Sequence, residues 1–225
     1  MRRGDSDSCM ARLNVPLREL HGEIVITVNS LRDPRKTIGA DCVGTAVWLL
    51  PPWYWRIVSG HHPQLTLLTD FTASIPYVGW PRLIRAGEDR IPGLPPSHVL
   101  WTVKKGLLGT TIHDEGSAWL VLKHSERWVY SDSRGPSRRE FRRMEASATM
   151  GHTRKEIRQL ADRHGTAVAF GLRRSPDLPA FGCLSVHTQR GTVLSDEECD
   201  AVGSSLALTA PAVAKVIVET LHLPV

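Results

Sequence analysis

Two helical stripes of apolar residues, one near each end of the chain, restrict the folds open to it more than any other feature. The first follows Pro16 and ends at Asp33-Pro34, with apolar residues three or four positions apart at Leu17, Leu20, Ile24, Val28 and Leu31. The second follows a capping box at 195–198 and continues through Val202, Leu206, Val213, Ile217 and Leu221. We expect Pro211 to kink or split this second helix. Each stripe needs another layer of structure to cover it.

Between the stripes, strand-length apolar runs come in hairpin-like pairs rather than alternating with helices. We predict strands at 43–50, 53–59, 65–71, 101–103, 127–131, 166–172 and 180–187. A short helix is expected at 107–113, and helical composition marks 137–147 and 152–164. Thr153 and Glu156 have the spacing of a capping box. This order indicates an α+β fold with a largely antiparallel sheet and helices packed on it.

The length of 225 residues, with 41% apolar and 23% charged residues, fits one globular domain and excludes disorder or a disulfide-dense miniprotein. We expect a flexible tail at 1–15, followed by a single domain at 16–225. The segment 72–100 holds five prolines and three glycines, which predicts a long irregular loop. The stretch 134–164 is expected to be a helical insertion.

The net charge of +5 has a local origin, because the segment 134–174 holds eleven basic residues against four acidic ones. A basic segment of this kind indicates either a surface for an anionic partner or a solvated, arginine-rich helical face. The second interpretation is favoured, since Phe141 is the only aromatic residue between 134 and 163. A nucleic-acid partner is therefore not expected.

Catalytic and metal-binding patterns are absent from the sequence. The four cysteines show no C-x-x-C spacing, His61 and His62 are adjacent, and there is no nucleophile elbow, phosphate-binding loop or H-E-x-x-H motif. We therefore predict no catalytic residue and no metal site. The N-terminus lacks the apolar core of a signal peptide, and no run of about 18 apolar residues occurs, so a cytoplasmic location is expected and no membrane span.

Three segments together resemble the GAF domain superfamily, the small-molecule sensor modules of signalling proteins. IGADCVGTAVWLLPPWYWRIVSG (38–60) is similar to the first hairpin of the family, and VKKGLLGTTIHDEGSAWLVL (103–122) is similar to its glycine-rich connection. The segment 167–210 resembles the final hairpin and closing helix. The resemblance covers about 17–220. This chain departs from the family near Gly171, where the usual proline is replaced, and at 72–100 and 134–164, which are longer than a minimal member needs.

The resemblance implies a central antiparallel sheet of five or six strands, with the terminal helices on one face and a pocket covered by loops and a short helix on the other. The termini of such domains often pair between two subunits, which implies a homodimer through the terminal helices. A pocket of this kind is apolar with a few polar groups. The candidate ligand-binding residues are Trp101, Lys105, Leu108, Thr110, His113, Trp119, Tyr130 and Phe170. Trp101, Trp119 and Tyr130 equally suit an ordinary core.

The function that follows from the resemblance is a cytoplasmic regulatory domain that senses a small organic ligand and signals through a protein partner or a dimer interface, rather than an enzyme. The cofactor is not identified, because the cyclic-nucleotide signature of some relatives is absent and no bilin-attaching cysteine lies between Cys42 and Cys183. One alternative is a thiol-dependent redox enzyme related to the free methionine sulfoxide reductases. Another is a module that binds nucleic acid or protein through 134–174.

Overall fold

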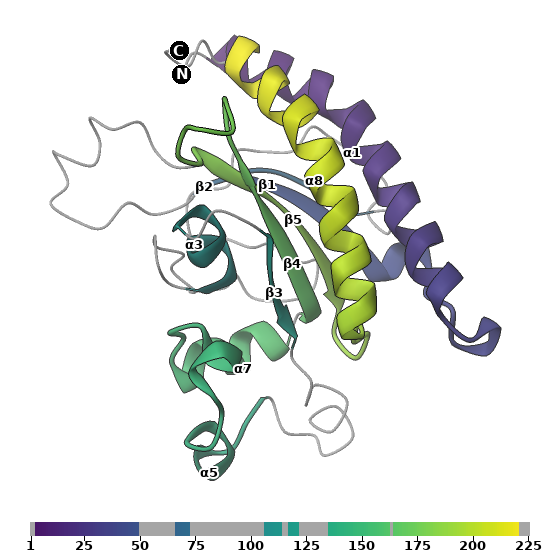
Figure 1. Cartoon of the computed structure of the whole chain (residues 1–225), viewed down its shortest axis with the longest axis vertical. Coiled ribbons are helices and arrows are strands. Elements are labelled where there is room, and N and C mark those ends of the chain that lie inside the picture. The colour runs from purple at the N-terminus through teal and green to yellow at the C-terminus, as the bar shows by residue number, and fades with distance from the viewer. Residues whose placement is uncertain are drawn as a thin grey trace, which may run out of the picture.

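A computed structural model describes residues 3–49, 66–72, 106–113, 117–121, 135–162 and 164–220. Helices and strands follow one another in an order that begins and ends with a long helix (Figure 1). The long helices are α1 (Arg3–Leu31) and α8 (Asp196–Thr220), and the shorter ones are α3 (Gly106–His113), α5 (Arg138–Phe141), α6 (Ala146–Thr149) and α7 (Arg154–Ala161). Two 3-10 turns, η1 (Pro34–Lys36) and η2 (Ala40–Cys42), link α1 to the first strand. The strands are β1 (Val43–Leu49), β2 (Thr66–Thr72), β3 (Ser117–Val121), β4 (His164–Leu172) and β5 (Gly182–Gln189).

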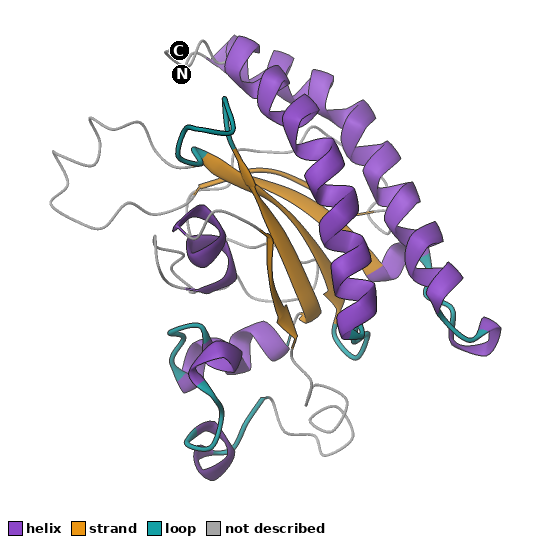
Figure 2. Ribbon diagram, viewed as in Figure 1, coloured by secondary structure: helices purple, strands orange, loops and turns teal. Residues whose placement is uncertain are grey.

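The described strands form one antiparallel sheet in the order β2-β1-β5-β4-β3. β5 lies in the centre, where Val47 pairs with Leu184 and Ala169 pairs with Ser185. The predicted α+β class with an antiparallel sheet is therefore confirmed. Figure 2 shows the sheet between two layers of helix, with α1 and α8 along one face and the shorter helices on the other side.

The face under α1 and α8 carries the larger hydrophobic core. Alternate residues of β4 and β5 point to it, including Val168, Leu172, Leu184 and Val186, all almost fully buried. Both predicted stripes supply the other half of this core. On α1 these residues are Leu13, Leu17, Leu20, Ile24 and Val28, and on α8 they are Val202, Leu206, Ala210, Val213, Ala214 and Ile217. The two stripes therefore interlock and cover the sheet together.

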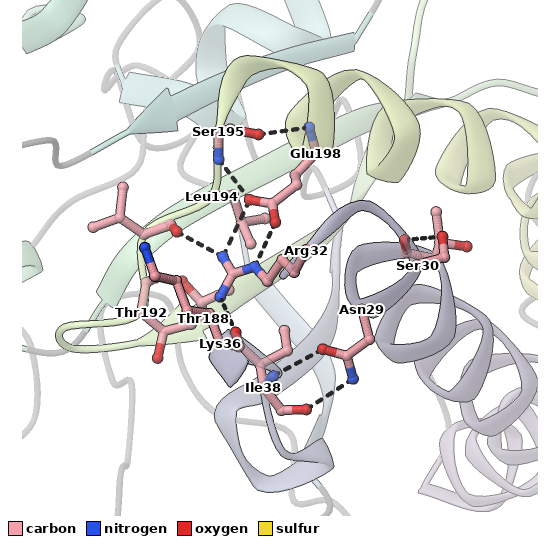
Figure 3. Close-up of polar contacts among 12 residues, drawn as sticks. Asn29, Ser30, Arg32, Lys36, Ile38, Thr188, Thr192, Leu194, Ser195 and Glu198 are labelled. Atoms are coloured by element: carbon pink, nitrogen blue, oxygen red, sulfur yellow. Dashed lines mark hydrogen bonds and ion pairs between the residues drawn. The ribbon is translucent and has the colours of Figure 1, made fainter. Parts of the chain in front are cut away.

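Arg32 ties the end of α1 to the start of α8 (Figure 3). Its guanidinium pairs with the Glu198 carboxylate and also donates to the carbonyl of Val193 at 2.8 Å. Glu198 in turn accepts from the backbone N–H of Ser195 at 2.6 Å, which completes the predicted capping box. Burial alone would raise the pKa of Glu198, but the hydrogen bonds from Arg32 and Ser195 outweigh it and hold the pKa below its ordinary value.

The prediction of a flexible tail at 1–15 is wrong for the residues that the structure describes. Helix α1 begins at Arg3 and continues through Pro16. Contacts before the proline explain this, since Leu13 is fully buried and Arg12 donates to Glu219 and Thr220 at the far end of α8. Tertiary contacts thus outweigh the backbone hydrogen bond that Pro16 cannot make. Pro211 likewise lies inside α8, which is not split.

Several other expectations fall outside the described residues. These are the strands at 53–59, 101–103 and 127–131 and nearly all of the loop at 72–100, of which only Thr72 is described, at the end of β2. The helical insertion at 134–164 consists, where it is described, of α5, α6 and α7. The edge strand β3 was not predicted as a strand.

Helix α8 is long and apolar enough to cross a membrane by length and composition alone, with a mean hydropathy of 1.6 over its most apolar window. The core helix of a protein passes the same test. Val202, Leu206, Val213 and Ile217 are fully buried against α1 and the sheet. This packing accounts for the apolar composition of α8.

The Arg32→Ala variant tests the junction between the long helices. Loss of the guanidinium leaves the Glu198 carboxylate buried without its partner, and we expect the free energy of unfolding at pH 7 to fall by about 3 kcal/mol. Because the pKa of Glu198 is depressed in the folded protein, the stability that this pair supplies is complete above the unfolded pKa of about 4.3 and is lost as the pH falls through the folded pKa. The difference between wild type and variant should therefore shrink in acid.

Urea denaturation over a series of pH values measures this difference. Arg18→Ala is the matched control, because Arg18 is an exposed arginine of the same helix. A difference between wild type and Arg32→Ala that stayed constant from neutral to acid pH would contradict the assigned role of the ion pair.

Candidate functional site

The sheet face opposite α1 and α8 is covered by α3 and α7 in the described part of the chain (Figure 1). α3 lies over β4 and β5, and its inward residues are Leu107 and Thr111, one turn apart and about 1% exposed. Thr111 donates its hydroxyl to the carbonyl of Leu107 at 2.9 Å, so its polar group is satisfied within the helix. α7 adds Ile157 and Leu160 to the same core.

Small side chains dominate the strand residues on this face, which we call the α3 face. β1 contributes Gly44 and Ala46, β4 contributes Ala167, Ala169 and Gly171, and β5 contributes Cys183 and Ser185. A Cβ at Gly171 would lie 3.3 Å from the Cβ of Ala180 and 3.4 Å from the carbonyl oxygen of Thr111, so α3 packs against the strand at this position. The face under the terminal helices is instead filled by leucine, isoleucine and valine. The two faces therefore differ in how far their side chains reach from the sheet.

Trp48 is the large residue of β1 on the α3 face, and a hydrogen bond orients it. Its indole N–H donates to the hydroxyl of Ser185 on β5 at 3.0 Å, and that hydroxyl donates to the carbonyl of Ala46 at 3.4 Å. Both side chains are more than nine-tenths buried. The indole is thus held in one position at the centre of the sheet.

A histidine pair lies at the end of β5 on this side. His187 follows Cys183 and Ser185 by strand alternation, and it pairs in register with Gly44 on β1. Its ring meets the ring of His164 at the start of β4, with centroids 4.8 Å apart and the planes at 66°. Both rings are partly exposed. Together with Ser185, they make a polar line along an otherwise apolar surface.

The insertion joins α3 through an unusual turn. Met150 and Gly151 both have positive φ, 44° and 75°, and the carbonyl of Met150 accepts from the backbone N–H of Gly106 at 2.7 Å. A left-handed methionine is uncommon. The partly buried Met150 side chain packs against the core under α3. This turn therefore links the start of α3 to the insertion.

The structure places the predicted ligand-binding residues unevenly. Thr110 lies half-buried on α3. Leu108 and His113 belong to the same helix, Trp119 belongs to β3, and α3 contacts β3. The predictions for Trp101, Lys105 and Tyr130 lie outside the described residues.

Phe170 was predicted to line the ligand site, but its side chain lies on the other face of the sheet. Phe170 packs against the core under the terminal helices, as do its alternate neighbours Val168 and Leu172. Ala169, one position away, packs on the α3 face. Because side chains alternate along a strand, the phenyl ring cannot line a site under α3.

Three residues of the α3 face were missed by the sequence analysis: Trp48, Ser185 and His187. The alternation of side chains along β5 would have placed Ser185 and His187 on this face. Once Leu184 and Val186 are assigned to the helix-covered face, 183, 185 and 187 must share the other. Trp48 gives no such signal, because both faces of β1 are buried.

Cys183 lies on the α3 face but lacks the properties of a reactive thiol. Its side chain is fully buried, and burial raises its pKa above the ordinary value. A nucleophilic cysteine needs the opposite shift. Cys42, the other candidate, lies half-buried in η2, where it packs against the core under the terminal helices. The two thiols are therefore not grouped around one site.

No metal centre is found within the described ranges: no three or more histidine, cysteine, aspartate or glutamate side chains gather there closely enough to hold an ion. The His164–His187 pair supplies two nitrogen-bearing rings only.

Several solved structures that align with this chain are GAF domains. The GAF domain of an Acinetobacter phosphoenolpyruvate-protein phosphotransferase has a TM-score of 0.42 and 14% identity, covering 100% of this chain and 99% of its own. A GAF domain/HD domain protein from Geobacter sulfurreducens has a TM-score of 0.42 and 12% identity, covering 96% and 99%. A phycocyanobilin-bound GAF domain of a cyanobacterial phytochrome has a TM-score of 0.40 and 14% identity, covering 95% and 96%. No family model and no curated protein matches the chain.

Thiol labelling tests the chemistry assigned to Cys183. In a variant that retains Cys183 and Cys42 and carries Cys9→Ser and Cys199→Ser, we expect native Cys183 to react at least about 100-fold more slowly than Cys42 with an aromatic disulfide reagent. Denaturant should abolish the difference. Preferential labelling of Cys183 in the native protein would contradict this assignment and support the thiol-dependent enzyme.

Proposed function

We propose that this chain is a cytoplasmic, GAF-like regulatory domain that binds a small organic ligand between α3 and the sheet. The observation that carries the proposal is the contrast between the two sheet faces. One is closed by two long helices with branched aliphatic side chains, and the other has a floor of glycine, alanine and serine under a short helix.

A floor of small residues suits a flat, mostly apolar ligand. Ala46 and Ala169 keep the side chains of this floor short, whereas Trp48 offers an aromatic edge or face. Ser185 and His187 on β5 and Thr110 on α3 supply polar groups. This combination of an apolar wall with a few polar atoms is typical of small-molecule sites.

The signalling part of the proposal uses the terminal helices. Ile26 on α1 and Leu208 on α8 are 71% and 80% exposed, although they belong to the helices that close the core. These two side chains mark where we propose that a second copy or a protein partner makes contact. The sheet would connect that contact to the ligand, because the two helices and α3 pack on opposite faces of the same strands.

Native mass spectrometry of freshly purified protein, without refolding, tests the ligand. We expect a mass excess that disappears on denaturation, because an apolar ligand over such a floor buries most of its surface. A clean apo mass would contradict a retained ligand and favour protein interaction as the function.

Variants locate the ligand through the bound fraction in the same spectrum. We expect Lys105→Ala and Thr110→Val each to reduce this fraction severalfold, since each removes one polar partner worth about 1 kcal/mol. Phe170→Leu is the control, because Phe170 packs on the opposite face of the sheet. An unchanged fraction in both test variants would contradict the site.

Leu208→Asp tests the dimer. If α8 contributes to a contact between two copies, a buried aspartate carries a large desolvation cost, and the mass from light scattering should fall from dimer to monomer. Leu178→Asp is the control, since Leu178 is also exposed but lies between β4 and β5. A monomeric wild type would exclude the homodimer.

A further inference from the structure

The basic segment at 134–174 does not form one surface. Arg173 and Arg174 follow the end of β4, whereas α5, α6 and α7 precede its start. The nine residues of β4 span roughly 27 Å. Figure 1 shows α5 and α7 at one end of the sheet and the turn after β4 at the other. Arg174 instead lies 5.9 Å from the ring centroid of Phe181, a contact within its own hairpin.

Four arginines remain together on and immediately after α5. We call Arg138, Arg139, Arg142 and Arg143 the arginine surface. All four are exposed. None of their guanidinium groups has a carboxylate partner among the residues that the structure describes, in contrast to Arg12, which pairs with Glu219. Unneutralised guanidinium groups at this density repel one another, and an anionic partner would relieve that repulsion.

Local structure holds the arginine surface outward. Ser137 and Glu140 form a complete capping box at the start of α5, so the Glu140 carboxylate accepts from the Ser137 N–H at 2.9 Å. Phe141 and Met144 lie partly buried against the core under α3. The apolar residues of this segment thus face the domain, and the arginines occupy its outer side.

The spacing of the arginines matches a helical array of carboxylates. Arg138 and Arg142 stand four positions apart, and so do Arg139 and Arg143. The backbone remains helical at Arg142, whose N–H donates to the carbonyl of Arg138. It tightens at Arg143, whose N–H donates to the carbonyl of Glu140, so α-helical spacing holds for the Arg138–Arg142 pair. Residues four apart on a helix are separated by about 6 Å along its axis, which is also the repeat of acidic residues at i and i+4 on a partner helix. Guanidinium groups bind carboxylates through two parallel hydrogen bonds.

We propose that the arginine surface docks an acidic helical segment of a partner protein. Nucleic acid fits less well for two reasons. A protein that contacts about 6 to 10 phosphates of a duplex needs a comparable number of cationic or polar groups, whereas this surface holds four arginines. Single-strand binding uses exposed aromatic rings for stacking, and Phe141, the aromatic residue of this segment, packs against the core. The proposal does not depend on a ligand at the α3 face.

A fluorescent, alanine-rich helical peptide of about 16 residues, with glutamates at i and i+4 along one face, is the probe. We expect anisotropy to report binding at about 50 mM salt that weakens several-fold by about 200 mM. Replacing all four arginines of the surface with glutamine should weaken binding at least about tenfold, since each exposed ion pair contributes up to about 1 kcal/mol.

A control variant removes four positive charges elsewhere and should bind the peptide as wild type does. Its substitutions are Arg18→Gln, Arg35→Gln, Lys36→Gln and Lys215→Gln, all at exposed positions. Far-UV circular dichroism and melting temperature verify that both variants remain folded. Equal losses in the two variants would overturn the proposal, because binding would then follow net charge alone.

Two further outcomes would also overturn it. One is an absence of peptide binding at the lower salt concentration. The other is tighter binding of a duplex DNA of about 16 base pairs than of the peptide at the same salt, which would assign the arginine surface to nucleic acid. A peptide of the same composition, with its glutamates spread around the helix, should bind more weakly than the probe.

Discussion

The antiparallel packing of α1 against α8 is the constraint on which the rest of the structure depends. The stripe from Leu13 to Val28 and the stripe from Val202 to Ile217 cover one face of the sheet only when both helices are present. Arg12 and Arg32 fix the register at the two ends, through Glu219 and Glu198 respectively. Formation of the sheet is thereby coupled to both ends of the sequence.

This closure leaves the opposite face available for chemistry. The long aliphatic side chains gather in the larger core, whereas the strand residues of the α3 face are mostly small or polar. The hydrogen bond from Trp48 to Ser185 and the left-handed turn at Met150 are consistent with such a division. Buried polar networks and left-handed non-glycine residues cost stability in a core, and both are common at sites that position a ligand. The proposed ligand site lies on this face for that reason.

Sequence patterns predicted the elements that carry their own periodicity. The strand at 43–50, the helix at 107–113 and the capping boxes at Thr153 and Ser195 depend on local spacing, and the structure contains all of them. Helix α1 before Pro16 carries the same spacing, since Leu13 stands four positions before Leu17, but Pro16 was interpreted as a helix start. The contacts from Arg12 to Glu219 and Thr220 that hold this turn lie about 200 positions away and leave no local signal. Phe170 was assigned to the wrong face, since β4 is buried on both sides and its apolar residues do not reveal which side the long helices cover.

The separation of Arg32 from Glu198 by 166 residues has a consequence for biosynthesis. At roughly 5 to 20 residues per second, the ribosome needs about 10 to 30 s to make the chain between them. During that interval the apolar stripe of α1 has been made and its partner helix does not yet exist. The nascent chain therefore offers an amphipathic helix to chaperones, and the larger core closes only after α8 has been made.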